Sequence, residues 1–586
     1  MCGINGVWHS KQKINKTHFI LSRDRLQHRG PDDAGLWFNE DENIGFGHRR
    51  LAFMDLSESG RQPMQTSDGS VIVTVNGEIY NYPELKNELE GKGYHFFSRS
   101  DSEVLLYAWQ EWHTGMLKKL NGMFAFALYD KSRNEMLLAR DRFGIKPLYY
   151  HRDAYNLIFA SEIKAIINYA PELKTIRSES MADYFSYRYI PSPHSIYESI
   201  KKLEPASFLL IGENTDITEK YWTPPENTIR LPQPEITEKI HELLSRSVRM
   251  HTQSDVPVGA FLSGGYDSSA IVSLLHDNKI DANTYSIGFS NWENSEDRFA
   301  KLVAETFDMP HYSKIADRNH LEMLENLMQH YDEPIADISI LPTWLVSQLA
   351  SEQNKAVLSG EGADELFGGY TWHYENLLAQ KQEAHIWRKN PSVSPFSVES
   401  YSRAMAMGHL RKPGLEQLFT GDFRNSIPED SDWFYRQHAS GKANANRFRR
   451  MDLRCFMGEL VLTKVDRASM AHSLEVRVPF LENELADFML RLSPKQIYKS
   501  GVQKFQLYQI IKNKLPREIL ERKKQGFVGP DRYYRSAEWY RGIISESKLV
   551  HDGIINQSEL NHYLQNHMYW KLWKFAVLEN WYKTWM

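Results

Sequence analysis

The stretch that decides the fold is Val256-Pro257-Val258-Gly259-Ala260-Phe261-Leu262, followed at once by Ser263-Gly264-Gly265-Tyr266-Asp267-Ser268-Ser269. Its first half is a short apolar run that suits a buried strand, and the apolar residues 270–275 that come next predict a helix. A strand, a glycine loop and a helix in this order begin a parallel α/β domain.

The glycine loop 263–269 predicts a phosphate site. Glycines let phosphate oxygens approach backbone N–H groups closely, and the next helix points its N-terminus at the same place. No Lys-Ser/Thr pair follows the glycines, so this is not a Walker A loop. Asp267 would repel a phosphate unless a cation bridged the two, so the loop implies Mg²⁺.

A second acidic glycine loop runs from Ser359 to Glu365, after the apolar residues 356–358. Its three carboxylates would be costly together without a metal ion or proton transfer. We assign Asp364 to Mg²⁺ together with Asp267, and we assign Glu361 to proton transfer.

Length and composition set the broad class. The 586 residues exceed what one hydrophobic core serves, so we expect two or more domains. A formal net charge of -5 gives no electrostatic case for nucleic acid. The sequence has no apolar run near the ~20 residues of a membrane span, no signal-peptide pattern, and only two cysteines. We therefore expect a cytoplasmic protein without a nucleic-acid or membrane partner.

The first domain is predicted to be rich in β-structure. Residues 71–75 suit a strand that turns at Asn76-Gly77, and residues 123–129 and 135–140 suit a hairpin around 130–134.

Prolines at 224, 225, 232 and 234 then predict an extended linker, and residues 236–248 predict an amphipathic helix. We expect a first domain at 2–210, a linker at 211–235 and a second domain at 236–586, mainly helical after about 375. An aromatic stripe near the C-terminus, from Trp570 to Trp581, favours core packing over a membrane-surface or partner helix.

Cys2 directly follows the initiator methionine, and its small side chain permits removal of that residue. Cleavage would leave a thiol and an α-amine on one residue, and an amine with a pKa of about 7.7–8.0 can act as base for its own side chain. An N-terminal cysteine alone proves little, and an incidental cysteine remains open.

Motifs spread over nearly the whole chain carry a family resemblance. They are Met1-Cys2-Gly3-Ile4, His28-Arg29-Gly30-Pro31-Asp32, Gly47-His48-Arg49-Arg50-Leu51, Val75-Asn76-Gly77-Glu78-Ile79-Tyr80-Asn81, Ser100-Asp101-Ser102-Glu103, Arg140-Asp141-Arg142-Phe143-Gly144-Ile145-Lys146-Pro147-Leu148, the loops at Ser263 and Gly360, Asp466-Arg467-Ala468-Ser469-Met470-Ala471-His472-Ser473-Leu474-Glu475-Val476-Arg477-Val478-Pro479-Phe480, and Lys523-Lys524-Gln525-Gly526-Phe527. The chain resembles the glutamine-hydrolysing asparagine synthetase family of the bacterial class B type.

The resemblance implies an α+β fold, an N-terminal-nucleophile αββα sandwich, followed by an α/β adenine-nucleotide alpha-hydrolase-like (PP-loop) domain with extra helices. It implies that glutamine is hydrolysed in the first domain. Ammonia then passes through an internal tunnel to a carboxylate activated by ATP as its acyl-adenylate, and the products are an amide, AMP and pyrophosphate. A homodimer is compatible with the family.

Residue roles in the first domain follow from the same resemblance. Cys2 is the expected nucleophile, and Asn76 with the Gly77 backbone N–H is the expected oxyanion hole. Arg50 is expected to bind the glutamine carboxylate, and Glu78 and Asp101 its α-ammonium.

In the second domain the resemblance implies three groups of ATP-binding residues. The residues expected at the adenosine part are Leu262, Ile287, Ser359 and Gly360. Those expected at pyrophosphate are Ser263, Gly264, Gly265 and Ser268. Lys524 is expected to neutralise the α-phosphate.

The sequence departs from the family pattern at three places. Tyr266 replaces the usual leucine, Glu204-Pro205-Ala206-Ser207 replaces a Pro-Pro-Gly turn, and residues 377–450 align with nothing familiar. The acceptor is therefore open. Aspartate is the leading hypothesis, and a sugar uronate, peptide or natural-product acid is the alternative. Two further hypotheses remain. The protein is a binding or regulatory protein with an inactive site, or it is a simple glutaminase or ATP pyrophosphatase.

Overall fold

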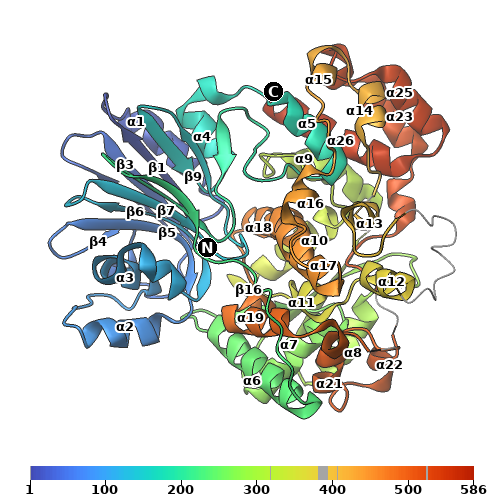
Figure 1. The fold of residues 1–586 in the computed structure, drawn as a ribbon, viewed down its shortest axis with the longest axis horizontal. Coiled ribbons are helices and arrows are strands. Elements are labelled where there is room, and N and C mark those ends of the chain that lie inside the picture. The colour runs from blue at the N-terminus through green and yellow to red at the C-terminus, as the bar shows by residue number, and fades with distance from the viewer. Residues whose placement is uncertain (1, 317, 381–392, 406, 500, 523–524) are drawn as a thin grey trace.

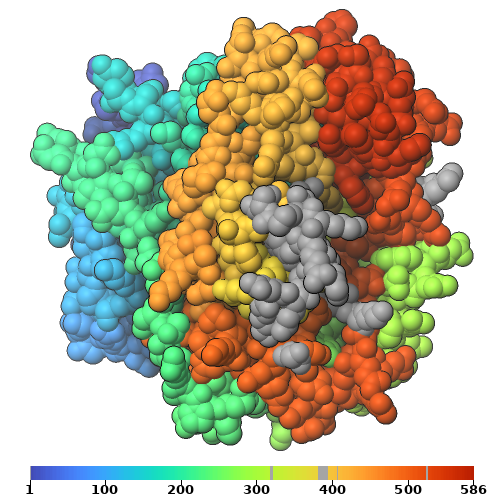
Figure 2. Space-filling view, turned by 45° about the vertical axis from the view of Figure 1, so that its right-hand side comes forward, coloured from blue at the N-terminus to red at the C-terminus, as the bar shows by residue number. Residues whose placement is uncertain are grey.

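The computed structural model describes residues 2–586 except 317, 381–392, 406, 500 and 523–524. Two sheets with their helices form the first part of the chain, on the left of Figure 1, and a larger, mainly helical part lies on the right. Figure 2 shows the two parts in contact, with the orange C-terminal helices against the cyan and green segments. None of the described helices is both long enough and apolar enough to cross a bilayer.

The first part contains two six-stranded sheets whose described strand pairs are all antiparallel. One has the order β10-β8-β9-β1-β3-β2 and the other β12-β11-β7-β6-β5-β4. Their strands are β1 (Gly3–His9), β2 (Asp33–Phe38), β3 (Ile44–Arg50), β4 (Met64–Gln65), β5 (Val71–Ile79), β6 (Gly122–Asp130), β7 (Glu135–Arg140), β8 (Tyr149–Arg152), β9 (Asn156–Ala160), β10 (Ile200–Lys202), β11 (Ser207–Gly212) and β12 (Asp216–Lys220).

The two sheets pack face to face. Buried side chains from both sheets, among them Ile4, Phe46, Ile72, Ala125 and Phe159, form one apolar cluster between them. Helices α1 (Lys16–Asp24) and α4 (Ile163–Tyr169) lie on the outside of the first sheet, and α2 (Tyr82–Glu90) and α3 (Val104–Trp112) on the outside of the second. This is the αββα sandwich that the sequence predicts, and the expected hairpin is present as β6–β7.

The expected turn at Asn76-Gly77 is wrong. Both residues lie inside β5, paired with Ala125 and Phe124 of β6. Gly77 has φ +156°, and a Cβ there would lie 2.1 Å from the Met123 carbonyl oxygen. The close approach of two strands, rather than a chain reversal, requires this glycine.

The segment 211–235 is not wholly extended. Strand β12 pairs with β11 and adds an edge strand to the second sheet. Beyond it, α6 (Gln233–His251) begins with a proline in its first turn and buries Ile236, Ile240, Leu243, Leu244 and Val248 along one face, as its apolar spacing predicts.

The second part is built on a five-stranded parallel sheet with the order β15-β14-β13-β16-β17. Its strands are β13 (Val258–Phe261), β14 (Thr284–Phe289), β15 (His311–Ala316), β16 (Ala356–Leu358) and β17 (Glu475–Arg477). Because the chain moves outward from β13 to β15 and then returns to β16, right-handed crossovers place helices on both faces of the sheet. The predicted α/β domain with extra helices is confirmed.

Its described α-helices from α7 onward are α7 (Tyr266–Asp277), α8 (Asp297–Thr306), α9 (Leu324–Met328), α10 (Ile340–Ser351), α11 (Ala363–Phe367), α12 (Thr371–Gln380), α13 (Val398–Ala404), α14 (Lys412–Leu418), α15 (Gly421–Asn425), α16 (Trp433–His438), α17 (Ala445–Met451), α18 (Leu462–Met470), α19 (Asn483–Arg491), α20 (Pro494–Ile497), α21 (Phe505–Ile511), α22 (Arg517–Leu520), α23 (Ala537–Ser545), α24 (Lys548–His551), α25 (Gln557–Gln565) and α26 (Tyr569–Trp585). A π-helical segment, Asp452–Val461, leads directly into α18. Trp573, Phe575, Leu578 and Trp581 of α26 are fully buried, so the aromatic stripe is core, as expected. Helix α5 (Ser178–Tyr187) belongs to the same core.

Candidate active sites

Cys2 stands at the start of β1, whose neighbours are β3 and β9. Its residue is 8% exposed, its backbone N–H donates to Asn76 Oδ1 at 3.1 Å, and its carbonyl accepts from Arg29 Nε at 3.1 Å. Burial raises the pKa of the Cys2 thiol above its ordinary value. The thiol therefore needs a nearby base to become a nucleophile.

Asn76 faces Cys2 from β5. Its Oδ1 accepts the Cys2 N–H, whereas its Nδ2 is buried and has no hydrogen-bond partner among the residues that the structure describes. A buried amide donor left without an acceptor is costly, and a ligand oxygen at this point would remove that cost. The Asn76 Nδ2 is therefore positioned as a hydrogen-bond donor for an oxyanion that develops during attack by Cys2.

Arg50 lies at the end of β3 and is 7% exposed. Its two Nη atoms donate to the carbonyls of Met54, Asp55 and Ser57, at 3.1, 2.6 and 3.3 Å. These bonds orient the guanidinium by fixing it to the 54–57 loop. Because the guanidinium carries five N–H donors, donors remain for a carboxylate.

Glu78 and Asp101 form a buried acidic pair beside this loop. Burial, with Asp101 and Glu475 as further negative charges, raises the pKa of Glu78 well above its ordinary value against the opposing effect of Arg477. Burial likewise raises the pKa of Asp101 to about 6, although its Oδ2 accepts the Ile79 N–H at 2.7 Å. A bound cation such as an ammonium would favour the ionised form of both groups.

Two functional candidates in this region were missed by sequence reasoning, although both lie in quoted motifs. Arg29 is fully buried and holds the Cys2 carbonyl. Arg477, on β17 of the second part, lies 3.3 Å from Glu78 Oε1 and 2.6 Å from Glu475 Oε1. The buried Glu78 of the first part thus contacts a guanidinium from the second.

The phosphate loop lies at the carboxyl end of β13. Gly264 has φ +70°, and a Cβ on it would lie 2.5 Å from Phe299, so only glycine fits. Gly265 caps α7, Ser263 N donates to Ser268 Oγ at 3.1 Å, and the two serine hydroxyls lie 3.2 Å apart. These contacts close the loop into the turn that a phosphate requires.

The remaining nucleotide candidates surround this loop. Leu262 follows β13 directly, Ile287 lies in β14, and Ser359 and Gly360 follow β16. A Cβ on Gly360 would lie 2.8 Å from Asp267 Cβ, so the two glycine loops touch. The structure therefore brings together the residues expected at adenosine and at pyrophosphate. Lys524, expected at the α-phosphate, lies outside the described residues.

Asp267 and Asp364 converge on one cation. Lys504 Nζ lies 2.5 Å from Asp267 Oδ1 and 2.7 Å from Asp364 Oδ1. The two carboxylates, aided by hydrogen bonds, raise the pKa of Lys504 despite the opposing effect of its burial. The carboxylate pair thus fits a cation position, and Mg²⁺ is usually held by one or two carboxylates together with substrate phosphates. Nothing in the sequence around Lys504 pointed to this role.

Glu361 belongs to the second glycine loop and is influenced by the buried Lys464. Burial raises the pKa of its carboxyl, Lys464 opposes this shift, and Asp364 and Asp267 add to it. A carboxyl with a raised pKa suits proton transfer near neutral pH.

Two further side chains brace the loop. Arg522 donates from Nη1 to the Ser263 carbonyl at 3.1 Å, and Tyr266 donates to the Leu520 carbonyl at 2.5 Å. Tyr266, the departure from the family pattern, therefore links α7 to the last residue of α22, Leu520.

The chain matches two family models, a glutamine amidotransferase domain over residues 1–222 and asparagine synthase over residues 239–583. It is 34% identical to asparagine synthetase 1 of Bacillus subtilis (strain 168) in an alignment of 599 positions, which covers 97% of this chain and 93% of that protein. The chain belongs to the asparagine synthetase family.

Two other relatives show how far the similarity extends. Asparagine synthetase 3 of B. subtilis is 29% identical over 96% of this chain and 93% of its own length. An amidase of Gibberella zeae, chry2, is 28% identical over 92% of this chain and 88% of its own length. As an asparagine synthetase family member this chain is an ATP-dependent, glutamine-hydrolysing amidotransferase.

Proposed function

We propose that this protein is a glutamine-dependent asparagine synthetase, which hydrolyses glutamine at Cys2 and uses the ammonia to amidate aspartate. The observation that carries the glutaminase half is the unpartnered Asn76 Nδ2 beside Cys2. The observation that supports the synthetase half is the contact between the two glycine loops, which brings Ser263, Asp267, Gly360 and Glu361 together.

In the first domain, removal of Met1 would convert the Cys2 nitrogen into an amine that takes the thiol proton. The sulfur then attacks the side-chain amide of glutamine, and Asn76 Nδ2 and the Gly77 N–H bind the oxygen that becomes negative. The amine returns the proton to the leaving ammonia, and water hydrolyses the thioester to glutamate.

Recognition of glutamine uses both its charged ends. Arg50 binds the α-carboxylate with the donors that its loop contacts leave over. Glu78 and Asp101 bind the α-ammonium, and the ion pair from Arg477 restrains Glu78. A bound ammonium group would favour the ionised form of this acidic pair, whose pKa values are raised by burial in its absence.

In the second domain, a carboxylate oxygen of the acceptor attacks the α-phosphorus of ATP and pyrophosphate leaves into the Ser263–Ser268 loop. Ammonia from the first domain, delivered through an internal passage, attacks the acyl carbon, and Glu361 takes the proton as AMP departs. Lys524 is proposed at the α-phosphate. Mg²⁺, when bound, would be held by Asp267 and Asp364 and would screen the phosphate charge from these carboxylates.

A second acceptor class is supported by one observation. The similarity to the G. zeae protein covers 92% of this chain, and that protein is named an amidase and not an asparagine synthetase. A sugar, peptide or natural-product acid is therefore the alternative acceptor.

The test is to incubate the purified chain, with Met1 removed, with ATP, Mg²⁺, glutamine and aspartate. We expect asparagine, AMP, pyrophosphate and glutamate in equal amounts. Glutamate formation without asparagine or AMP would refute aspartate as the acceptor and direct the search to other carboxylic acids. AMP formation unlinked to glutamate would indicate an uncoupled pyrophosphatase.

Three further points belong to the proposal. Domain boundaries are proposed at 2–210 and 236–586, with 211–235 between them. A cytoplasmic location is supported by two cysteines that are both free thiols. A homodimer is proposed from the resemblance alone, and light scattering would test it.

A further inference from the structure

Both main-chain polar atoms of Cys2 are held by side chains. Asn76 Oδ1 accepts from its nitrogen and Arg29 Nε donates to its carbonyl, each at 3.1 Å. Once these atoms are fixed, rotation about the Cα–Cβ bond is the main freedom left to the thiol. The position of Arg29 therefore helps to set the position of the sulfur.

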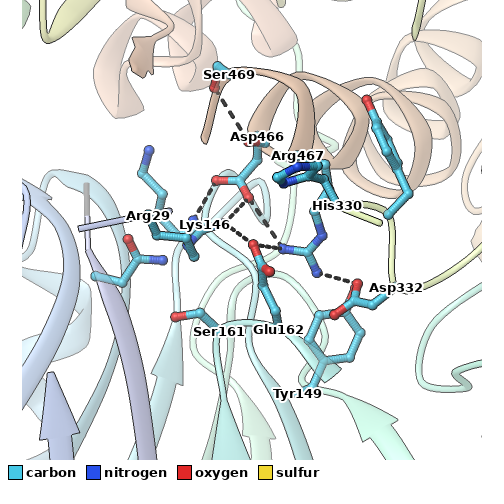
Figure 3. A network of polar contacts seen from close by, with 12 residues as sticks. Arg29, Lys146, Tyr149, Ser161, Glu162, His330, Asp332, Asp466, Arg467 and Ser469 are labelled. Carbon is cyan, nitrogen blue, oxygen red and sulfur yellow. Dashed lines mark hydrogen bonds and ion pairs between the residues drawn. The ribbon is translucent and has the colours of Figure 1, made fainter. Parts of the chain in front are cut away.

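Arg29 is in turn held from the second domain (Figure 3). Asp466 on α18 binds it through two parallel contacts, Nη1 to Oδ2 at 2.7 Å and Nη2 to Oδ1 at 2.9 Å. The three residues Arg29, Glu162 and Asp466 have side chains that are 0 to 3% exposed. A bidentate guanidinium–carboxylate pair fixes direction as well as distance, and burial protects it from salt.

Glu162 of the first domain cannot replace Asp466 as the sole support. Its carboxylate also contacts Lys164 at 2.6 Å and Arg467 at 3.1 Å, in addition to Arg29 at 2.7 Å. Without Asp466, Arg29 would keep the Glu162 carboxylate, which it shares with the neighbouring Arg467 cation, whereas Arg467 would keep Asp332 as well. Repulsion between the two guanidinium groups would then displace Arg29.

Helix α18 links this contact to the second active site. Lys464 and Asp466 are two residues apart, so they point to nearly opposite sides of the helix. Lys464 Nζ donates to Ser339 Oγ at 2.8 Å and is the main positive charge acting on Glu361, whereas Asp466 faces the first domain. Close by, Ser473 Oγ donates to the His28 carbonyl at 2.7 Å, which adds a second contact to the Arg29 segment.

We propose that Asp466 is a positioning residue for glutamine hydrolysis: from the ATP-dependent domain it holds Arg29, and through Arg29 the carbonyl of Cys2, in the geometry that attack requires. The inference rests on the proposed role of Cys2 as nucleophile. A displacement of the sulfur by about 1 Å is enough to lower the rate of attack by up to about 100-fold.

The experiment compares Asp466→Asn with Asp332→Asn in the full-length chain. Asp332 belongs to the same buried network, but it binds Arg467 of the same helix at 3.0 Å and the Lys164 N–H at 3.1 Å. Intact mass would verify removal of Met1 in each variant, and thermal unfolding would verify folding. Glutamine hydrolysis and ammonia-dependent AMP formation are then measured side by side.

We expect Asp466→Asn to lower kcat for glutamine hydrolysis about 10- to 100-fold with KM changed less than about threefold. Ammonia-dependent AMP formation should stay within about twofold of the unmodified chain, as should both activities of Asp332→Asn. The rate of Cys2 alkylation by an electrophilic glutamine analogue, followed by mass spectrometry, should fall in parallel with kcat.

Other outcomes would overturn the inference. They are an unchanged kcat in Asp466→Asn, an equal loss in Asp332→Asn, or a parallel loss of ammonia-dependent activity that marks general damage to the interface. If Asp466→Asn does not fold, Arg29→Lys offers a second arm, because it keeps the charge but lacks the fork and should show the same selective loss of kcat. An unmodified chain that fails to hydrolyse glutamine would instead refute the proposed function, and this inference with it.

Discussion

Arg477 Nη2, from the parallel sheet of the second domain, lies 3.3 Å from Glu78 Oε1 in the antiparallel sheet of the first. The same guanidinium donates to the carbonyls of His251 and Gln253, each at 2.8 Å. The main-chain carbonyl of Arg477 accepts from Ser359 N at 2.8 Å, at the start of the second glycine loop. One residue thus touches the proposed glutamine pocket and the proposed nucleotide site.

The first prediction concerns Cys2. Cys2→Ala should abolish glutamine-dependent amidation and leave ammonia-dependent amidation within about twofold, because the two reactions use different residues. Formation of the amide product from either nitrogen source is the measurement. Persistence of both activities in this variant would refute the assignment of the nucleophile.

The second prediction concerns Asn76. Asn76→Ala should lower kcat for glutamine hydrolysis about 100- to 1,000-fold with a smaller effect on KM, because the lost donor acts on the transition state. Asn81→Ala, which removes a half-buried amide that donates to the Lys119 carbonyl and accepts from the Asn121 N–H, is the control. A similar loss in both variants would point to damage of the segment instead of loss of an oxyanion donor.

The third prediction is a pH profile. Glutamine binding needs ionised Asp101, whose pKa is raised to about 6, chiefly by burial. Ionisation is lost as the pH falls through this value, and the α-amine of Cys2, with an ordinary pKa of about 7.7–8.0, is already being protonated there. The logarithm of kcat/KM for glutamine should therefore fall below about pH 8, and more steeply as Asp101 and Glu78, whose pKa burial also raises, become protonated.

Asp101→Asn tests the assignment of the lower limb. The variant should have a reduced kcat/KM at every pH and a shallower fall near pH 6 than the unmodified chain. A profile that retains the steeper limb would assign the ionisation to another group.

The fourth prediction concerns Lys504. Lys504→Gln leaves Asp267 and Asp364, which are 24% and 22% exposed, without their shared ammonium. The free energy of unfolding should fall by about 1–3 kcal/mol, less than for a fully buried pair. Millimolar Mg²⁺ without nucleotide should restore more of the lost Tm than it adds to the unmodified chain, because a divalent cation fits the same two carboxylates.

Lys512→Gln is the control for this measurement, since Lys512 is exposed and its ammonium donates to the neutral side chain of Gln509. Thermal unfolding with and without MgCl₂ is sufficient. Equal responses to Mg²⁺ in all three proteins would contradict a cation position at Asp267 and Asp364.

The elements that sequence reasoning predicted are those whose signals are local. The apolar run before Ser263, the glycine at 264 and the spacing of Ile236, Ile240 and Leu243 each reflect a constraint within a few residues, and the structure confirms all three. The prediction of a turn at Asn76-Gly77 was wrong because the glycine is required by the close approach of Met123 on the neighbouring strand and not by a change of chain direction.

Contacts between distant residues were beyond this reasoning. Lys504 meets Asp267 across 237 positions, and Arg29 meets Asp466 across 437. Hydrophobic periodicity carries no information on such pairs, and a lysine before a short helix looks like any surface lysine. Arg29 and Arg477 lie in the motifs that carry the family resemblance, but their partners could not be predicted without the fold.

The burial of Cys2 also limits how the protein can be handled. Its nitrogen and carbonyl are hydrogen-bonded to the buried side chains of Asn76 and Arg29, and Arg29 is bound by Asp466 of the second domain. An uncleaved affinity tag fused ahead of residue 2 would keep this buried nitrogen in a peptide bond and prevent formation of the free α-amine. Purification handles are better placed in an exposed surface loop, such as the β11–β12 connection at 213–215, than at the front of the chain.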